Sequence, residues 1–97
     1  MKRGYRFSVA AARDLVEIGT YTQQTWGVAQ RRVYLNRLQK CFETLSVQPK
    51  LGKSRSELPG MRGFHHDHHV IFYMATPDDI LIVRVLHERQ DPTRHLK

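Results

Sequence analysis

Apolar residues recur at helical spacing in two stretches of the first half of the chain. Ser8 is a good helix cap, and the apolar residues after it are mostly three or four positions apart. Asp14 and Glu17 follow early, where the positive end of a helix favours acidic residues. Trp26-Gly27 then interrupts the pattern. The apolar face of the second stretch is formed by Leu35, Leu38, Phe42 and Leu45. The pattern predicts two amphipathic helices joined by a tight turn.

The remaining pattern is typical of strands and turns. Residues 5–7 alternate before the first helix, whereas prolines and glycines break residues 48–60 into a loop. Strands are expected at residues 61–64, 69–74 and 80–86, with a turn at 65–68. The predicted fold class is α+β, in the order β-α-α-β-β-β. An N-terminal strand precedes an antiparallel two-helix hairpin, and a three-stranded antiparallel segment completes one small sheet.

One charged residue, Arg84, interrupts the apolar last strand. Strict alternation puts Leu81, Val83 and Val85 on one face, which we expect the helices to cover, and Arg84 on the opposite, open face. A charge among apolar neighbours needs a carboxylate, a phosphate or water. Two interpretations follow: Arg84 pairs with an acidic side chain of its own domain, or it faces a partner.

Length and composition predict one ordinary globular domain over residues 1–97. The chain has 97 residues, of which 40% are hydrophobic and 26% charged. Its single cysteine, Cys41, cannot form an intramolecular disulfide, as suits the reducing cytoplasm. The longest apolar run, residues 70–75, is far shorter than the ~18 residues that span a bilayer, and the N-terminus lacks a signal-like apolar region. We therefore expect a cytoplasmic protein that has no membrane partner.

The charge balance favours acidic partners. Sixteen Lys and Arg against nine Asp and Glu give a formal charge of +7 and a pI near 10.1. Such a surface attracts nucleic acid, an anionic membrane surface or an acidic protein segment. Charge alone does not choose among these.

Two kinds of chemistry are conceivable from residue types. On a strand, His65, Asp67 and His69 would share a face and could suit zinc or nickel, but the turn expected among them favours an exposed polar turn, so we predict no metal. RNA cleavage needs a base, an acid and cations for the phosphate. Residues of these types are Lys53, Arg55, Arg62, Arg84 and His87, although their spacing is not diagnostic.

Several strings together resemble one protein family over almost the whole chain. They are Ala12-Arg13-Asp14-Leu15, Trp26-Gly27, Pro49-Lys50-Leu51-Gly52, Pro59-Gly60-Met61-Arg62, His69-Val70-Ile71-Phe72-Tyr73 and Val83-Arg84-Val85-Leu86-His87-Glu88-Arg89-Gln90-Asp91. The last string is the most specific. With them the chain resembles the toxin subunits of bacterial type II toxin-antitoxin modules, in the ParE branch of the RelE/ParE superfamily.

This resemblance implies a toxin that binds DNA gyrase, traps it on cleaved DNA and is silenced by a ParD-like antitoxin. It implies neither an enzyme nor a cofactor or small-molecule substrate. The related RelE branch instead cuts messenger RNA on the ribosome, and on that alternative the catalytic candidates are Arg62, Arg84 and His87.

The basic residues supply candidate contacts for both implied partners. For the antitoxin we select Arg31, Arg32 and Lys40 on the polar side of the hairpin and Arg84 on the open sheet face. For gyrase we select the basic loop, one following arginine and the tail, namely Lys50, Lys53, Arg55, Arg62, Arg89 and Arg94. The alternative for each is an ordinary solvated surface charge.

Overall fold

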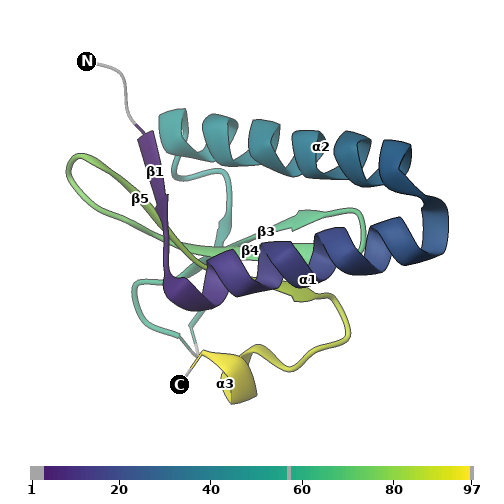
Figure 1. The fold of residues 1–97 in the computed structure, drawn as a ribbon. Helices are drawn as coiled ribbons and strands as arrows, with labels where there is room; N and C mark the ends of the chain where they lie inside the picture. Colours follow the sequence, from purple (N-terminus) through teal and green to yellow (C-terminus); the bar gives the residue numbers. More distant parts are fainter. Residues whose placement is uncertain (1–3, 57, 97) are drawn as a thin grey trace.

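In the computed structural model, which describes residues 4–56 and 58–96, two long helices pack on a single mixed sheet (Figure 1). The elements are β1 (Gly4–Phe7), α1 (Val9–Trp26), α2 (Val28–Val47), β2 (Lys53–Ser54), β3 (Arg62–His66), β4 (His69–Ala75), β5 (Asp79–His87) and α3 (Pro92–His95). The α+β class and the predicted succession of strand, helical hairpin and antiparallel strands are confirmed. The pattern did not predict β2 and α3, because elements this short carry no measurable periodicity.

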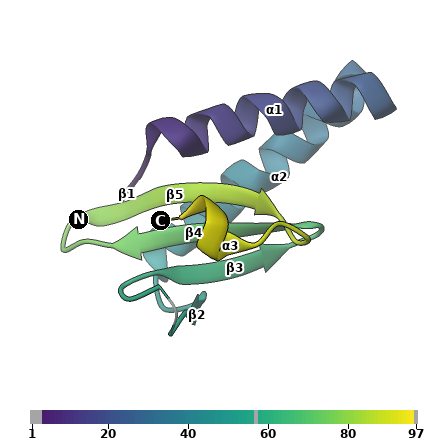
Figure 2. The same ribbon diagram turned by 90° about the horizontal axis from the view of Figure 1, so that it is seen from below.

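The sheet places the first strand beside the last. Its strand order is β1-β5-β4-β3-β2, in which β1 runs parallel to β5 and the other neighbours are antiparallel. The helical hairpin makes the crossover that a parallel pair requires. Figure 2 shows α2 behind the sheet and α3 in front of it, so these two helices lie on opposite faces.

Local signals explain where the two long helices begin and end. The Ser8 hydroxyl caps α1 by accepting the backbone N–H of Ala11 at 2.9 Å. Gly27 separates the helices with a φ of 98°, a left-handed conformation that favours glycine. The first turn of α1 holds no acid, however, so the predicted dipole role of Asp14 and Glu17 is wrong. Among the described residues, neither long helix is apolar enough to cross a membrane.

Two apolar clusters cover the two faces of the sheet. The larger lies under the hairpin and contains Ala11, Leu38, Phe42, Leu45, Ile71, Tyr73, Ile80, Ile82 and Val85. The smaller contains Leu58, Met61, Phe72 and Leu86, and Leu96 from the C-terminal segment packs against it. The face opposite the hairpin is therefore partly covered by the 48–60 loop and the tail.

A β-bulge changes which residues of β5 face the helices. In the register with β4, Phe72 pairs with Arg84 but Tyr73 pairs with Ile82, so Val83 is an extra residue. The predicted alternation is wrong before the bulge, where Ile80 and Ile82 lie in the helix-covered core in place of Leu81 and Val83. After the bulge Val85 returns to that core, as predicted.

The basic loop is held down by one tyrosine. The Tyr73 hydroxyl donates to the carbonyl of Pro49 at 2.7 Å and accepts the backbone N–H of Gly52 at 2.9 Å. Burial raises the pKa of Tyr73, so the hydroxyl keeps its proton. A Cβ at residue 52 would lie 2.5 Å from the tyrosine oxygen. Only glycine fits this close approach.

Gly52→Ala is expected to lower the free energy of unfolding by about 1–3 kcal/mol, because the added methyl group displaces Tyr73 from a packed site. Urea denaturation followed by circular dichroism measures the loss. Gly4→Ala is the control, since no atom lies within 4 Å of its added Cβ. Equal losses in the two variants would contradict the proposed close approach.

Candidate functional site

A cleft of about 720 Å³ lies between the hairpin and the end of the sheet. From the helices it is lined by Asp14, Glu17, Ile18, Tyr21, Thr22, Trp26, Gln30, Tyr34 and Arg37, and from the sheet end by Asp67, His68, His69, Arg84, Val85, His87 and Gln90. Trp26 and Tyr21 are 70% and 67% exposed. A cleft of this size with aromatic and charged walls is a suitable binding site for a ligand or a partner segment.

A buried ion pair forms the inner end of the cleft. The guanidinium of Arg84 donates through Nε and Nη2 to both carboxylate oxygens of Asp14, each at 2.8 Å. The two side chains are 19% and 8% exposed. Hydrogen bonding to Asp14 raises the pKa of Arg84, and Nη1 donates to the carbonyl of His95 at 3.0 Å. The interpretation that Arg84 pairs with an acid of its own domain is confirmed. In the sheet register Arg84 lies opposite Phe72 of the smaller cluster, on the face away from the hairpin, as predicted, and its guanidinium reaches Asp14 from there.

The Asp14–Arg84 pair lies beside the part of β5 that no longer pairs with β1. β1 pairs with β5 only as far as Phe7 and Ile82, so the β5 backbone beyond Ile82 has an open edge. Ser8 donates its N–H to the Ile82 carbonyl at 2.9 Å and its hydroxyl to the Val83 carbonyl at 2.7 Å. Asp14 Oδ2 accepts the N–H of Val85 at 2.9 Å. Side chains at the start of α1 thus replace the missing strand.

Histidines form the wall of the cleft opposite α1. The Tyr34 hydroxyl lies 2.6 Å from Nδ1 of His69, whose ring meets His87 edge-on at 5.7 Å. His87 in turn stacks on His68 with 6.3 Å between ring centroids. Burial and the nearby His87 lower the pKa of His69, and burial raises the pKa of Tyr34 to about 12. Both members of this hydrogen bond are therefore neutral near pH 7.

Glu88 binds the exposed side of the same cluster. Its carboxylate lies 3.1 Å from Nε2 of His65 and 3.0 Å from Nδ1 of His68. The hydrogen bond from His68 lowers the pKa of Glu88, so the carboxylate stays charged. The shared strand face that would place His65, Asp67 and His69 together does not form, because a turn separates them. Among the described residues, no three donors are arranged to hold a metal ion.

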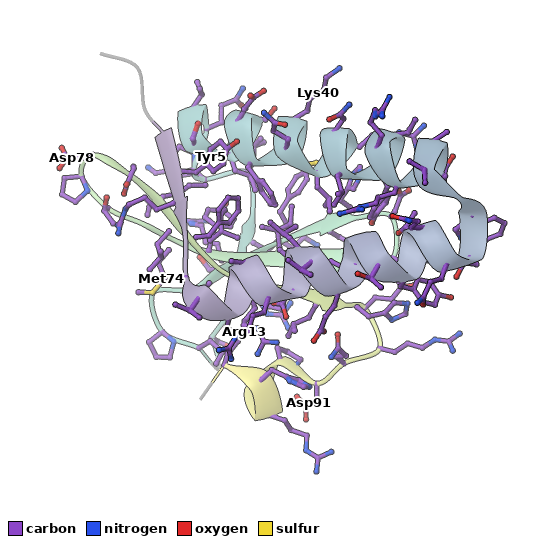
Figure 3. All side chains as sticks on the ribbon, in the orientation of Figure 1. Tyr5, Arg13, Lys40, Met74, Asp78 and Asp91 are labelled. Atoms are coloured by element: carbon purple, nitrogen blue, oxygen red, sulfur yellow. The ribbon has the colours of Figure 1, made fainter. Side chains whose placement is uncertain are left out.

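The cations selected on the hairpin do not form one patch. Arg31 donates to the side-chain oxygen of Gln23 at 2.8 Å, which places it at the junction of the two helices. Lys40 points away from α1 on the outer side of α2 (Figure 3). Arg32 is exposed on the same helix. A partner would have to surround α2 to contact all three.

The cations selected for gyrase fall into two groups. Near β2 and β3, Lys50 and Lys53 are exposed, whereas Arg62 donates to the Gly52 carbonyl at 2.7 Å and Arg55 lies 5.5 Å from the Phe72 ring centre. The second group, at the C-terminal end, consists of the exposed Arg89 and Arg94.

The three residues considered for RNA cleavage have different environments. Arg84 and His87 line the cleft, but Arg62 does not. The guanidinium groups of Arg84 and Arg62 already bind Asp14 and the Gly52 carbonyl. The structure thus gives these residues no shared catalytic arrangement.

Comparison with known proteins identifies the family. Residues 5–92 match the family described as ParE toxin of type II toxin-antitoxin system, parDE. The chain belongs to the ParE toxin family. It is 37% identical over 98 residues to Toxin ParE1 of Mycobacterium tuberculosis, covering 99% of this chain and 100% of the relative. Toxin ParE1 of Caulobacter vibrioides is 37% identical, with 95% of this chain and 96% of that protein covered.

Solved structures share the fold of this ParE-family toxin. One is the chromosomal ParDE toxin-antitoxin system from P. aeruginosa, with a TM-score of 0.74, 18% identity and coverage of 89% of this chain and 96% of that chain. Another is the RelBE2 toxin-antitoxin complex from Mycobacterium tuberculosis, with a TM-score of 0.66, 24% identity and coverage of 90% and 99%. At these identities the likeness concerns the fold alone.

Sequence reasoning did not select several residues of the ParE-family cleft. Asp14 had a usable signal, because it lies in the apolar stripe of α1 between Ala11 and Ile18, where only a paired acid is tolerated. The contact between Tyr34 and His69 had no usable signal in the sequence, because the two residues are 35 positions apart. The turn after β3 and the end of β5 bring these groups together only in the folded chain.

Arg84→Leu is expected to destabilise the toxin by about 3 kcal/mol, because it leaves the Asp14 carboxylate buried without its cation. Arg6→Leu is the matched control. It also removes an arginine bound to an aspartate, Asp79, but Arg6 is 58% exposed, so its loss of stability should be the smaller of the two. Urea denaturation at neutral pH measures both. A loss for Arg84→Leu no larger than that for Arg6→Leu would contradict a structural role for the pair.

His69 should make stability depend on pH. Because its pKa is lower in the folded than in the unfolded chain, protonation favours unfolding. The stabilisation from neutral His69 is present above about pH 6.5 and is lost as the pH falls toward the folded-state pKa. Between about pH 7.5 and 5.5 the wild type should lose more unfolding free energy than His69→Gln, whereas His95→Gln should behave as wild type. Identical losses in wild type and His69→Gln would rule out this contribution.

Proposed function

We propose that this chain is a toxin that binds DNA gyrase in the cytoplasm, traps the enzyme on cleaved DNA, and is neutralised by a ParD-like antitoxin. It acts by binding and not by catalysis, with no cofactor and no small-molecule substrate. The observation that carries this proposal is the match to ParE toxins over nearly the whole chain, at 37% identity across 99% of its residues. The gyrase target follows from the family resemblance of the sequence strings.

Charge and shape support an antitoxin partner. The related folds come from toxin-antitoxin complexes, and a chain with a formal charge of +7 suits an acidic segment that folds on binding. Arg32 and Lys40 offer exposed charges on α2, and Arg31 contributes at the helix junction. Arg84 contributes as part of the cleft wall, with its charge already balanced by Asp14.

The gyrase contact is proposed for the basic loop and the tail. Lys50, Lys53, Arg89 and Arg94 present exposed charges. Arg62 and Arg55 have a supporting role, because one holds the Gly52 carbonyl and the other covers Phe72, and together they fix the loop that carries the lysines.

RNA cleavage is the second candidate function. It is favoured by the presence of His87 and Arg84 in one cleft and by a fold shared with RelBE2. The ion pair of Arg84 weighs against it, because a cation bound by Asp14 is less able to bind a phosphate. The two candidate functions separate in one set of assays.

Incubation of the purified toxin with gyrase, ATP and supercoiled plasmid, followed by detergent and protease, should yield linear DNA above a gyrase-only control. Prior addition of the cognate antitoxin should abolish the linear product. Lys50→Ala/Lys53→Ala should reduce it several-fold if the loop holds a binding hot spot. Lys40→Ala is the matched control, which should weaken antitoxin binding without reducing gyrase trapping.

No linear DNA from a folded sample that still binds antitoxin would contradict the gyrase proposal. Cleavage of messenger RNA on translating ribosomes, lost in a folded His87→Ala variant, would then establish the second candidate.

A further inference from the structure

The basic loop, residues 48–60, and the start of the strand after it hold an excess of positive charge. Lys50, Lys53, Arg55 and Arg62 lie within residues 48–63, where the only acidic residue of the sequence is Glu57. The two lysines are exposed, and neither pairs with a carboxylate in the part of the chain that the structure describes. Their charge is therefore available to an external anion.

Arg62 adds a positive charge beside Lys53. β2 pairs with β3 so that Ser54 lies opposite Arg62. The Arg62 guanidinium donates to the carbonyl of Gly52, the residue directly before Lys53, at 2.7 Å. A carbonyl is neutral, so this hydrogen bond orients the guanidinium and leaves its positive charge uncompensated.

The loop holds these cations on an anchored backbone. Residues 48–51 form a tight turn, which is closed by a backbone hydrogen bond of 3.1 Å between its two ends. The buried hydroxyl of Tyr73 binds the backbone on either side of Lys50. Lys53 follows directly and lies on β2, which is hydrogen-bonded to β3. Because this backbone is already ordered, a ligand of the two lysines has little loop entropy to overcome.

Closely spaced cations beside a hydroxyl group match the backbone of a nucleic acid. Duplex DNA carries one negative charge per about 1.7 Å of its axis, so neighbouring cations can each meet a phosphate. An extended acidic peptide carries at most one charge per about 3.3 Å, and gains less from cations placed this closely. Serine is among the side chains that bind phosphates. Ser54 is exposed, and its hydroxyl has no hydrogen bond to a described residue.

We propose that the basic loop binds the phosphate backbone of DNA through Lys50 and Lys53, with support from Arg62 and Ser54. None of these four residues lines the cleft, and β2 lies at the edge of the sheet opposite β1 (Figure 2). In the complex with gyrase, the loop contacts the DNA that the enzyme holds. The inference rests on the proposed function for this place of action, whereas the binding itself needs DNA alone and no particular base sequence.

Binding of the purified toxin to a fluorescein-labelled duplex of about 20 base pairs, followed by fluorescence anisotropy between about 50 and 200 mM salt, tests the proposal. The slope of log K against log salt concentration counts phosphate contacts, at about 0.9 per contact. Lys50→Ala/Lys53→Ala should reduce the absolute slope by about 2 and lower the affinity at about 0.1 M salt by about ten-fold or more. A second duplex of unrelated sequence should show the same loss.

Arg32→Ala/Lys40→Ala is the matched control, because it removes the same charge from exposed positions of α2 and leaves the loop unchanged. Its slope should stay close to that of the wild type. Lys50→Ala and Lys53→Ala alone should each reduce the absolute slope by about 1, which provides a second measurement if circular dichroism shows the double variant to be unfolded.

Equal losses in the loop and α2 double variants would overturn the proposal, because binding would then follow the total charge. A folded wild type that does not bind the duplex at about 50 mM salt would also overturn it. So would a loop double variant that loses gyrase trapping but binds the duplex as tightly as the wild type, since the loop would then contact gyrase itself and the proposed function would stand. Loop-dependent DNA binding without gyrase trapping would support this inference and contradict the proposed function alone.

Discussion

The carboxylate of Asp14 accepts two hydrogen bonds from Arg84 and one from the backbone N–H of Val85, and so joins the first helix to the last strand. Both charges are largely removed from water, so each depends on the other. The bidentate geometry satisfies the carboxylate on both oxygens. The same residues complete the hydrogen bonding of β5 where β1 has ended. Helix position, sheet edge and charge balance therefore depend on a single contact.

The cleft is a consequence of that contact. Because α1 is fixed along the edge of β5, Tyr21 and Trp26 on its later turns line the cleft together with the histidines at the sheet end. Tyr34 on α2 contacts His69 on β4 and limits how far the hairpin can move from the sheet. Large exposed aromatic side chains on so small a domain are typical of interaction surfaces. The site is thus formed by three segments that are distant in the chain.

Three arginines of this toxin have structural roles. Arg84 balances a buried acid, Arg62 holds the backbone of the basic loop and Arg55 lies over an aromatic ring. Guanidinium groups suit these roles, since they stay charged and donate in several directions. Lys50 and Lys53 of the same loop are exposed, and no such contact of their side chains is seen among the described residues.

Local features of the fold could be predicted from the sequence because they depend on neighbouring residues. The helical period, the cap at Ser8, the glycine between the helices and the apolar strands all act over a few positions, and the family strings and the net charge are read directly.

The bulge at Val83 was not predictable, since it arises from the register of β5 on β4. It reversed the expected faces of β5 before the bulge only, and the open edge beyond β1 let Arg84 reach Asp14. Likewise, the histidine cluster was visible as a string, but its contacts with Tyr34, His87 and Glu88 required the turn that folds it against other elements. Sequence determines what is local in a chain, whereas pairings across 35 to 71 residues depend on the packing of the whole domain.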